Sequence, residues 1–213
     1  MQGIDVIFYI AILIMSVVIH EVSHGYMAEY FGDRTARYAR RLTLNPLRHL
    51  DPFGSIILPA LLVLSHAGFV VGWAKPVPYN PDNLRNRKWG TIAVASAGIL
   101  ANLFIAILFG IIIHFAPTFG LPPYDYFSPH PFYLITKIII IVNLALALFN
   151  LVPIPPLDGS KILFNLLPES FYHLTGFIER YSLIFLIIFI MFFSDFLYPI
   201  LVFLYHIITG VFA

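Results

Sequence analysis

The sequence predicts an all-α polytopic membrane protein. Of its 213 residues, 60% are hydrophobic and 11% are charged, whereas soluble globular domains carry about a quarter charged residues. The mean hydropathy of +0.88 agrees with this composition. Several apolar stretches approach the roughly 20 residues that a helix needs to cross a bilayer. We therefore expect one membrane-embedded domain over residues 1–213, with a core at about 4–167 and accessory helices at about 177–213.

The apolar stretches predict about five to six transmembrane helices. The candidates lie at 6–30, 52–74, 91–116, 138–153 and 182–213. The last is too long for one span at about 1.5 Å rise per residue. Since Ser194, Asp195 and Pro199 interrupt it, we expect two short spans joined near Asp195, with a single kinked helix as the alternative. No basic stretch and no cleavage site mark the first run as a signal peptide, so it is interpreted as a permanent span.

Basic residues predict the topology, because Lys and Arg concentrate on the cytoplasmic side. One basic cluster follows the first stretch and another follows 52–74. Both are cytoplasmic if 52–74 enters the membrane and returns, which Gly and Pro residues within it favour. We therefore expect a re-entrant segment or short β-hairpin between the first and second core helices. Such backbone is tolerated where it is buried in protein or lines a wet cavity. The N-terminus is then outside.

Net charge and cysteine content limit the function classes. A formal charge of +1 gives no indication of a nucleic-acid partner. The chain has 8 His and no Cys, so a metal site would use imidazole and carboxylate ligands.

An H-E-x-x-H motif in the first apolar helix is the strongest chemical signal. It consists of His20, Glu21 and His24. Side chains four residues apart share one helix face, so both imidazoles can bind one metal ion. Glu21 can then serve as general base for a water activated by zinc. Ionisable side chains are costly in a helix at the level of the lipid hydrocarbon, and they are functional there by default.

A catalytic zinc site needs a third protein ligand. Among the acidic residues Asp158 is the best candidate, because Pro153, Pro155 and Pro156 stop the preceding helix at a depth comparable to His20. An unwound segment at that depth, which carries the Asp158 carboxylate and the flexible Gly159, is suited to supply a metal ligand. The alternative is an ordinary interfacial loop in which Asp158 caps the next helix.

Five segments resemble the site-2 protease family of intramembrane metalloproteases, in its compact form without PDZ or CBS domains. They span about residues 16–165 and read HEVSH at 20–24, LTLNPLRHLDPFG at 42–54, GWAKPVPYNP at 72–81, GILAN at 98–102 and NLVPIPPLDG at 150–159. The resemblance implies one Zn²⁺ per chain on His20, His24 and Asp158, with Glu21 as general base. It also implies a prokaryotic cytoplasmic membrane and a transmembrane protein or peptide as substrate. Gly32 is expected to end the first helix, and the twelve residues that separate it from His20 place the active site nearer the cytoplasmic face.

Two asparagines in apolar helices are further candidates for the catalytic site. A buried amide usually satisfies a neighbouring backbone group or bridges helices, and this role remains open for Asn102, with Gly98 permitting close helix approach. The resemblance associates both Asn102 and Asn150 with the active site. Asn150 is the better candidate for holding substrate or the developing oxyanion.

The segment 68–73 offers a substrate-binding hypothesis. Its Phe-Val-Val run has strand-like residues, and the family is thought to use an edge strand between its first two core helices. An exposed strand edge could hold an unwound substrate by backbone pairing. A structural plug is the alternative.

The predicted function is hydrolysis of peptide bonds in or near transmembrane segments of membrane proteins. The alternative is a membrane zinc or proton transporter that uses the intramembrane His, Glu and Asp cluster, although no inverted repeat is apparent.

Overall fold

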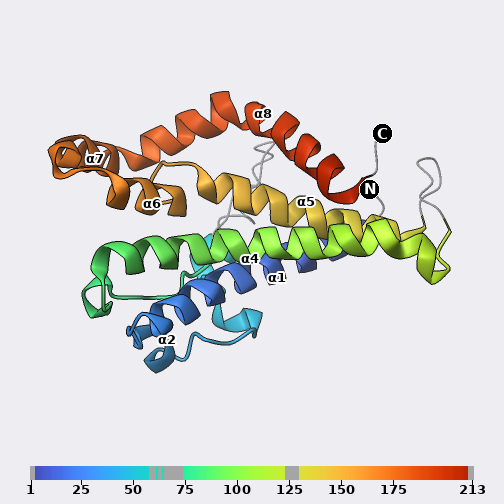
Figure 1. Cartoon of the computed structure of the whole chain (residues 1–213), viewed down its shortest axis with the longest axis horizontal. Helices are drawn as coiled ribbons and strands as arrows, with labels where there is room; N and C mark the ends of the chain where they lie inside the picture. The colour runs from blue at the N-terminus through green and yellow to red at the C-terminus, as the bar shows by residue number, and fades with distance from the viewer. Residues whose placement is uncertain (1–2, 58–60, 62–63, 65–73, 123–129, 211–213) are drawn as a thin grey trace.

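Three long helices run side by side through the protein. The computed structural model describes residues 3–57, 61, 64, 74–122 and 130–210, and every regular element in those ranges is helical. Figure 1 shows α1 (Gly3–Tyr30), α4 (Arg87–Phe115) and α5 (Pro131–Leu151) packed against one another. The predicted all-α class is confirmed.

Three helices of the described ranges are long and apolar enough to span a membrane. They cover Ile7–Tyr30, Arg87–Phe119 and Pro131–Leu151. A fourth span results if Tyr172–Arg180 and Ser182–Phe192, which meet at 74°, are counted together. The structure therefore supports three or four candidate spans. Of the expected re-entrant stretch 52–74, most lies outside the described residues, including 68–73; its first part is a π-helical turn at Pro52–Ile57.

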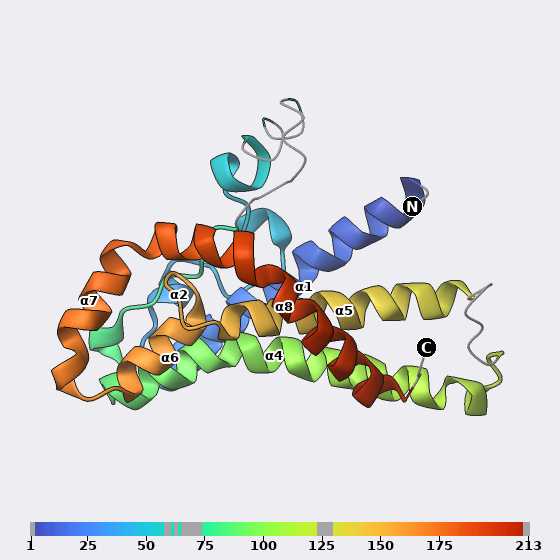
Figure 2. The same ribbon diagram turned by 90° about the horizontal axis from the view of Figure 1, so that it is seen from above.

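The C-terminal stretch is one helix, α8 (Ser182–Thr209), with Pro199 inside it. This agrees with the single-helix alternative and not with two spans joined near Asp195. A proline is tolerated inside a membrane helix because neighbouring groups satisfy the freed backbone. Helix α8 packs on α4 and α5, and in Figure 2 it crosses over both.

Short helices connect the long ones. They are α2 (Thr35–Tyr38), α6 (Asp158–Leu166), α7 (Tyr172–Arg180) and 3-10 turns at Pro46–Arg48, Pro81–Asn83, Ala116–Phe119 and Glu169–Phe171. Local sequence sets the helix ends. Helix α1 stops just before Gly32, whose φ of 110° favours glycine, as predicted for this position. The Asn86 side chain caps α4 by accepting the Trp89 N–H at 3.0 Å.

Small residues let α4 approach its neighbours closely, as is common between membrane helices. A Cβ added at Gly98 would lie 2.6 Å from the His20 ring of α1, and one at Gly110 would lie 2.0 Å from Ile208 of α8. Near the α4–α5 connection, a buried apolar cluster that includes Tyr133 unites α4, α5 and α8. These contacts hold α4 at the centre of the fold, against His20.

Asp33 fixes the loops that follow α1. It is fully buried, and its carboxylate accepts the backbone N–H of Thr35 at 3.1 Å, the backbone N–H of Asn80 at 2.7 Å and the Asn83 amide at 2.9 Å. Burial alone would raise the pKa of Asp33, but the hydrogen bonds from Thr35, Asn83 and Asn80 outweigh it and lower the pKa below its ordinary value. Asp33 thereby ties residues 80–83 to the end of α1.

Replacing Asp33 with Asn is expected to lower the melting temperature by about 5 °C near neutral pH. Both carboxylate oxygens of Asp33 accept hydrogen bonds, whereas the Asn amide would place an NH₂ donor against one of these N–H groups and lose that bond. Because the folded pKa is depressed, the carboxylate contributes fully above the unfolded pKa of about 3.9 and its contribution is lost as pH falls through the folded value. The difference between parent and variant should therefore shrink in thermal melts below about pH 4. Asp82→Asn, at a residue with 72% side-chain exposure, is the control and should change little.

Candidate metal centre

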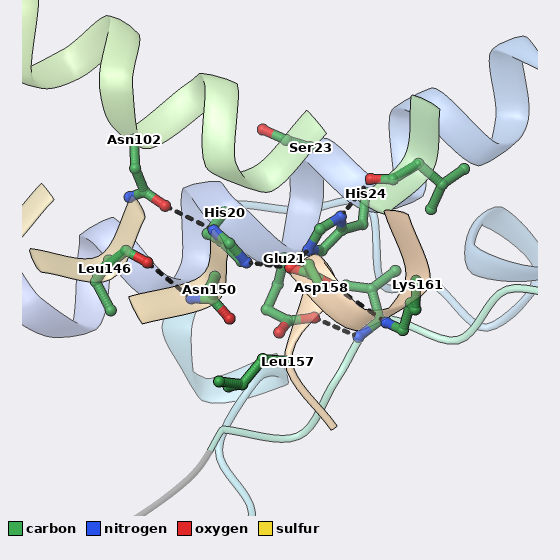
Figure 3. Close-up of polar contacts among 12 residues, drawn as sticks. His20, Glu21, Ser23, His24, Asn102, Leu146, Asn150, Leu157, Asp158 and Lys161 are labelled. Carbon is green, nitrogen blue, oxygen red and sulfur yellow. Dashed lines mark hydrogen bonds and ion pairs between the residues drawn. The ribbon is translucent and has the colours of Figure 1, made fainter. Parts of the chain in front are cut away.

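Three buried side chains from two distant segments converge on one point. His20 and His24 lie one turn apart on α1, and Asp158 is the first residue of α6. Asp158 Oδ2 lies 3.1 Å from His20 Nε2 and 3.0 Å from His24 Nε2. Figure 3 shows this carboxylate reaching between the two imidazole rings. One donor atom from each residue lies within 4.8 Å of the others, and all three residues are buried.

The turn between α5 and α6 positions Asp158. Helix α5 ends at Leu151, and the proline-rich segment 152–157 brings the chain back. Gly159 packs directly on the end of α5, since a Cβ there would lie 2.1 Å from the Leu151 carbonyl oxygen and 2.6 Å from that of Val152. Only glycine fits this contact, which explains the Asp-Gly pair.

Hydrogen bonds at Nδ1 set the direction of both imidazoles. His24 Nδ1 lies 2.6 Å from the Val94 carbonyl oxygen, which can only accept, so Nδ1 carries the proton. His20 Nδ1 lies 2.6 Å from Asn102 Oδ1 and donates in the same way. Each Nε2 is thereby turned toward Asp158. Metal-binding histidines are oriented by this kind of partner.

The donor set fits zinc. Two imidazole nitrogens and one carboxylate oxygen occur in catalytic zinc sites, and tetrahedral bonds of about 2.0–2.2 Å separate ligand atoms by about 3.4 Å. The observed 3.0 and 3.1 Å lie a few tenths of an ångström below that separation. Burial would raise the pKa of Asp158, but its contacts with His20, His24 and Lys161 outweigh burial and lower it, so the ligand is ionised. Lys161 Nζ lies 3.1 Å from the other oxygen, Oδ1.

Glu21 is held by a backbone contact that could not be predicted from the amino-acid sequence. Its Oε2 accepts the backbone N–H of Val77 at 2.8 Å. Arg41 fixes that segment, donating through Nη2 to the carbonyl oxygens of Lys75 at 2.6 Å and Pro76 at 3.3 Å. The half-buried Glu21 carboxylate therefore has a defined position next to the histidines.

The two candidate asparagines have different surroundings. Asn102 is fully buried on α4 and contacts His20 directly. Asn150 is half-buried in the last turn of α5 and donates one amide hydrogen to the Leu146 carbonyl oxygen at 3.0 Å. The second amide hydrogen is not used by that bond. Figure 3 shows Asn150 beside the His20 and Glu21 side chains.

Sequence reasoning missed several residues of the centre. Lys161 lies one turn after Asp158, and its i,i+3 spacing could have indicated the ion pair. Asn143 is an amide in an apolar helix, the same signal that identified Asn102. Val94 and Val77 contribute backbone groups, for which the amino-acid sequence carries no signal.

Comparison with known proteins gives two kinds of match. The family described as peptidase family M50 matches residues 8–133 and 128–193. YwhC of Bacillus subtilis (strain 168), named as a candidate zinc metalloprotease, is 39% identical over 181 residues, which are 84% of this chain and 78% of YwhC. Rip2 of Mycolicibacterium smegmatis (strain ATCC 700084 / mc(2)155), named likewise, is 33% identical over 155 residues, 72% of this chain and 54% of Rip2. No solved structure matches the chain.

Proposed function

Since the chain belongs to peptidase family M50, the site-2 protease family, we propose that His20, His24 and Asp158 hold its zinc ion. The protein is an intramembrane zinc metalloprotease, and neither the family nor the relatives support a transporter. The observation that carries the ligand assignment is the convergence of three buried donor atoms within 4.8 Å. When bound, zinc supplies a Lewis acid that activates water and polarises the scissile carbonyl.

Glu21 is the general base in this proposal. Its Oε2 is held by the Val77 N–H, so Oε1 is the oxygen that we assign to take the proton from the attacking water. The protonated carboxyl then delivers that proton to the leaving amine of the substrate. Arg41 supports this position indirectly, because it fixes the carbonyl groups of Lys75 and Pro76, the two residues before Val77.

The asparagines take different roles. Asn102 holds the His20 ring by accepting from Nδ1 at 2.6 Å, and so acts as a positioning residue. Asn150 is a catalytic residue here: its second amide hydrogen is available to bind the substrate carbonyl as negative charge develops. The half-buried position of Asn150 near the histidines supports this role.

The finer topology is also a proposal. We place the N-terminus outside a prokaryotic cytoplasmic membrane, with the zinc nearer the cytoplasmic face. Six residues of helix, about 9 Å, separate His24 from the end of α1 at Tyr30, and basic residues follow that end. The substrate is a transmembrane protein or peptide. The domain limits of about 4–167 and 177–213 belong to the same proposal.

Zinc removal and ligand replacement test the assignment. The purified protein in detergent should contain one zinc per chain, lose cleavage of a model transmembrane substrate on chelation, and regain it with added zinc. His20→Ala should weaken zinc binding by more than about 100-fold, because losing a ligand costs more than the 10- to 100-fold of an outer partner. His173→Ala, at an exposed position of α7, is the matched control. Equal zinc affinity in both variants would refute the ligand set.

A further inference from the structure

A buried polar chain extends from His20 into the centre of the bundle. Asn102 of α4 accepts from His20 Nδ1 at 2.6 Å, and its own Nδ2 donates to Asn143 Oδ1 of α5 at 2.8 Å. Asn143 Nδ2 in turn donates to Ser16 Oγ of α1 and to the Ile139 carbonyl oxygen, both at 2.9 Å. The residues of this relay are at most 5% exposed. We propose that Asn143, supported by Ser16, sets which nitrogen of His20 is free to bind metal.

The direction of the relay follows from one group that can only accept. The Ile139 carbonyl oxygen cannot donate, so the amide nitrogen of Asn143 must face it. Asn143 Oδ1 then faces Asn102 and requires a donor, which places the amide nitrogen of Asn102 there. Asn102 Oδ1 is thereby turned to His20, where it requires a proton on Nδ1. Each step fixes the next, and the result is a proton on Nδ1 with Nε2 turned toward Asp158.

Without Asn143, the orientation of Asn102 loses its main constraint. A flipped Asn102 would present NH₂ to His20 Nδ1, which would have to accept and would move the proton to Nε2. A protonated Nε2 cannot bind zinc. The remaining bond from Asn102 Nδ2, to the Ser16 carbonyl oxygen, is long at 3.5 Å. Asn143 is therefore a positioning residue that acts on the metal site through Asn102 and His20.

His24 has no such relay. Its Nδ1 donates directly to the Val94 carbonyl oxygen at 2.6 Å, and backbone cannot flip as an amide side chain can. The two histidines therefore differ: Asn143 should control the proton position of His20 and leave that of His24 unchanged. This difference separates a relay from a general loss of helix packing.

The test measures zinc affinity in the full chain by chelator competition and the Nδ1–H of each histidine by ¹⁵N NMR with zinc bound. It rests on the proposed zinc ligands. Asn102→Leu should weaken zinc binding about 10- to 100-fold, and Asn143→Leu about tenfold. In an Asn102→Leu background, Asn143→Leu should add less than about twofold, because the relay is already broken. In Asn143→Leu, the Nδ1–H signal of zinc-bound His20 should shift or broaden, because Asn102 no longer holds it, while the Nδ1–H signal of His24 stays unchanged.

Thr136→Val is the matched control, since it removes a buried hydrogen bond, to the Phe132 carbonyl oxygen at 2.7 Å, two turns earlier on α5. It should leave zinc affinity unchanged. If Asn143→Leu does not fold, the smaller Asn143→Ser is measured in its place. Unchanged zinc affinity in the Asn143 variant, or equal weakening with and without Asn102, overturns the relay. If His20→Ala also binds zinc normally, the ligand assignment itself has failed.

Discussion

A Glu21→Gln variant should bind zinc as tightly as the parent and lose between about 10²- and 10⁴-fold in kcat. The amide keeps the size of the side chain, and its carbonyl oxygen can still accept the Val77 N–H. The segment around Val77 therefore stays in place. The amide cannot take a proton from water, so only the chemical step is affected. Steady-state cleavage of a transmembrane substrate, together with zinc content, measures both quantities.

Glu29→Gln is the matched control, because Glu29 lies two turns later on α1 and forms an ion pair with Arg37. That variant should cleave substrate at nearly the parent rate. Substantial activity in Glu21→Gln with normal zinc content would require another base and would remove Glu21 from its assigned role.

Gly159→Ala should weaken the metal centre although it replaces no metal ligand. The new Cβ would lie 2.1 Å from the Leu151 carbonyl oxygen and 2.5 Å from its carbon. Because both are backbone atoms, α6 must move, and Asp158 moves with it. We expect zinc affinity to fall more than about tenfold and the melting temperature to fall by about 5 °C, from an overpacking cost of about 2 kcal/mol.

The control is Gly176→Ala in α7, where an added Cβ meets nothing within 4 Å. Alanine is the better helix former, so this change should be neutral or slightly stabilising. Parent-like zinc affinity in Gly159→Ala would show that α6 can shift without moving Asp158, and that the close turn does not position the carboxylate.

Much of the site could be predicted because its residues are recognisable by their type and by their spacing along the chain. The histidines at i and i+4 on one helix, and Asp158 beyond the prolines that end another, lie together in the structure. The end of α1 before Gly32 could be predicted for the same reason, since glycine marks it. Local chemistry was sufficient in these cases.

The rest depends on contacts between distant segments. The packing of α4 and of the loop before it on α1 decides two of these contacts. It brings the Val94 carbonyl to His24 and the Val77 N–H to Glu21. The continuity of α8 through Pro199 depends on packing in the same way, because the lost backbone bond is tolerated only among neighbouring helices. Sequence periodicity does not contain that information.

The origin of the ligands in α1 and α6 has a consequence for biosynthesis. The two histidines, at positions 20 and 24, are translated well before Asp158. Chains are made from the N-terminus, and an incomplete ligand set binds zinc poorly. With the proposed ligands, a nascent polypeptide therefore carries no complete zinc site, and so no proteolytic activity, until α6 has been translated.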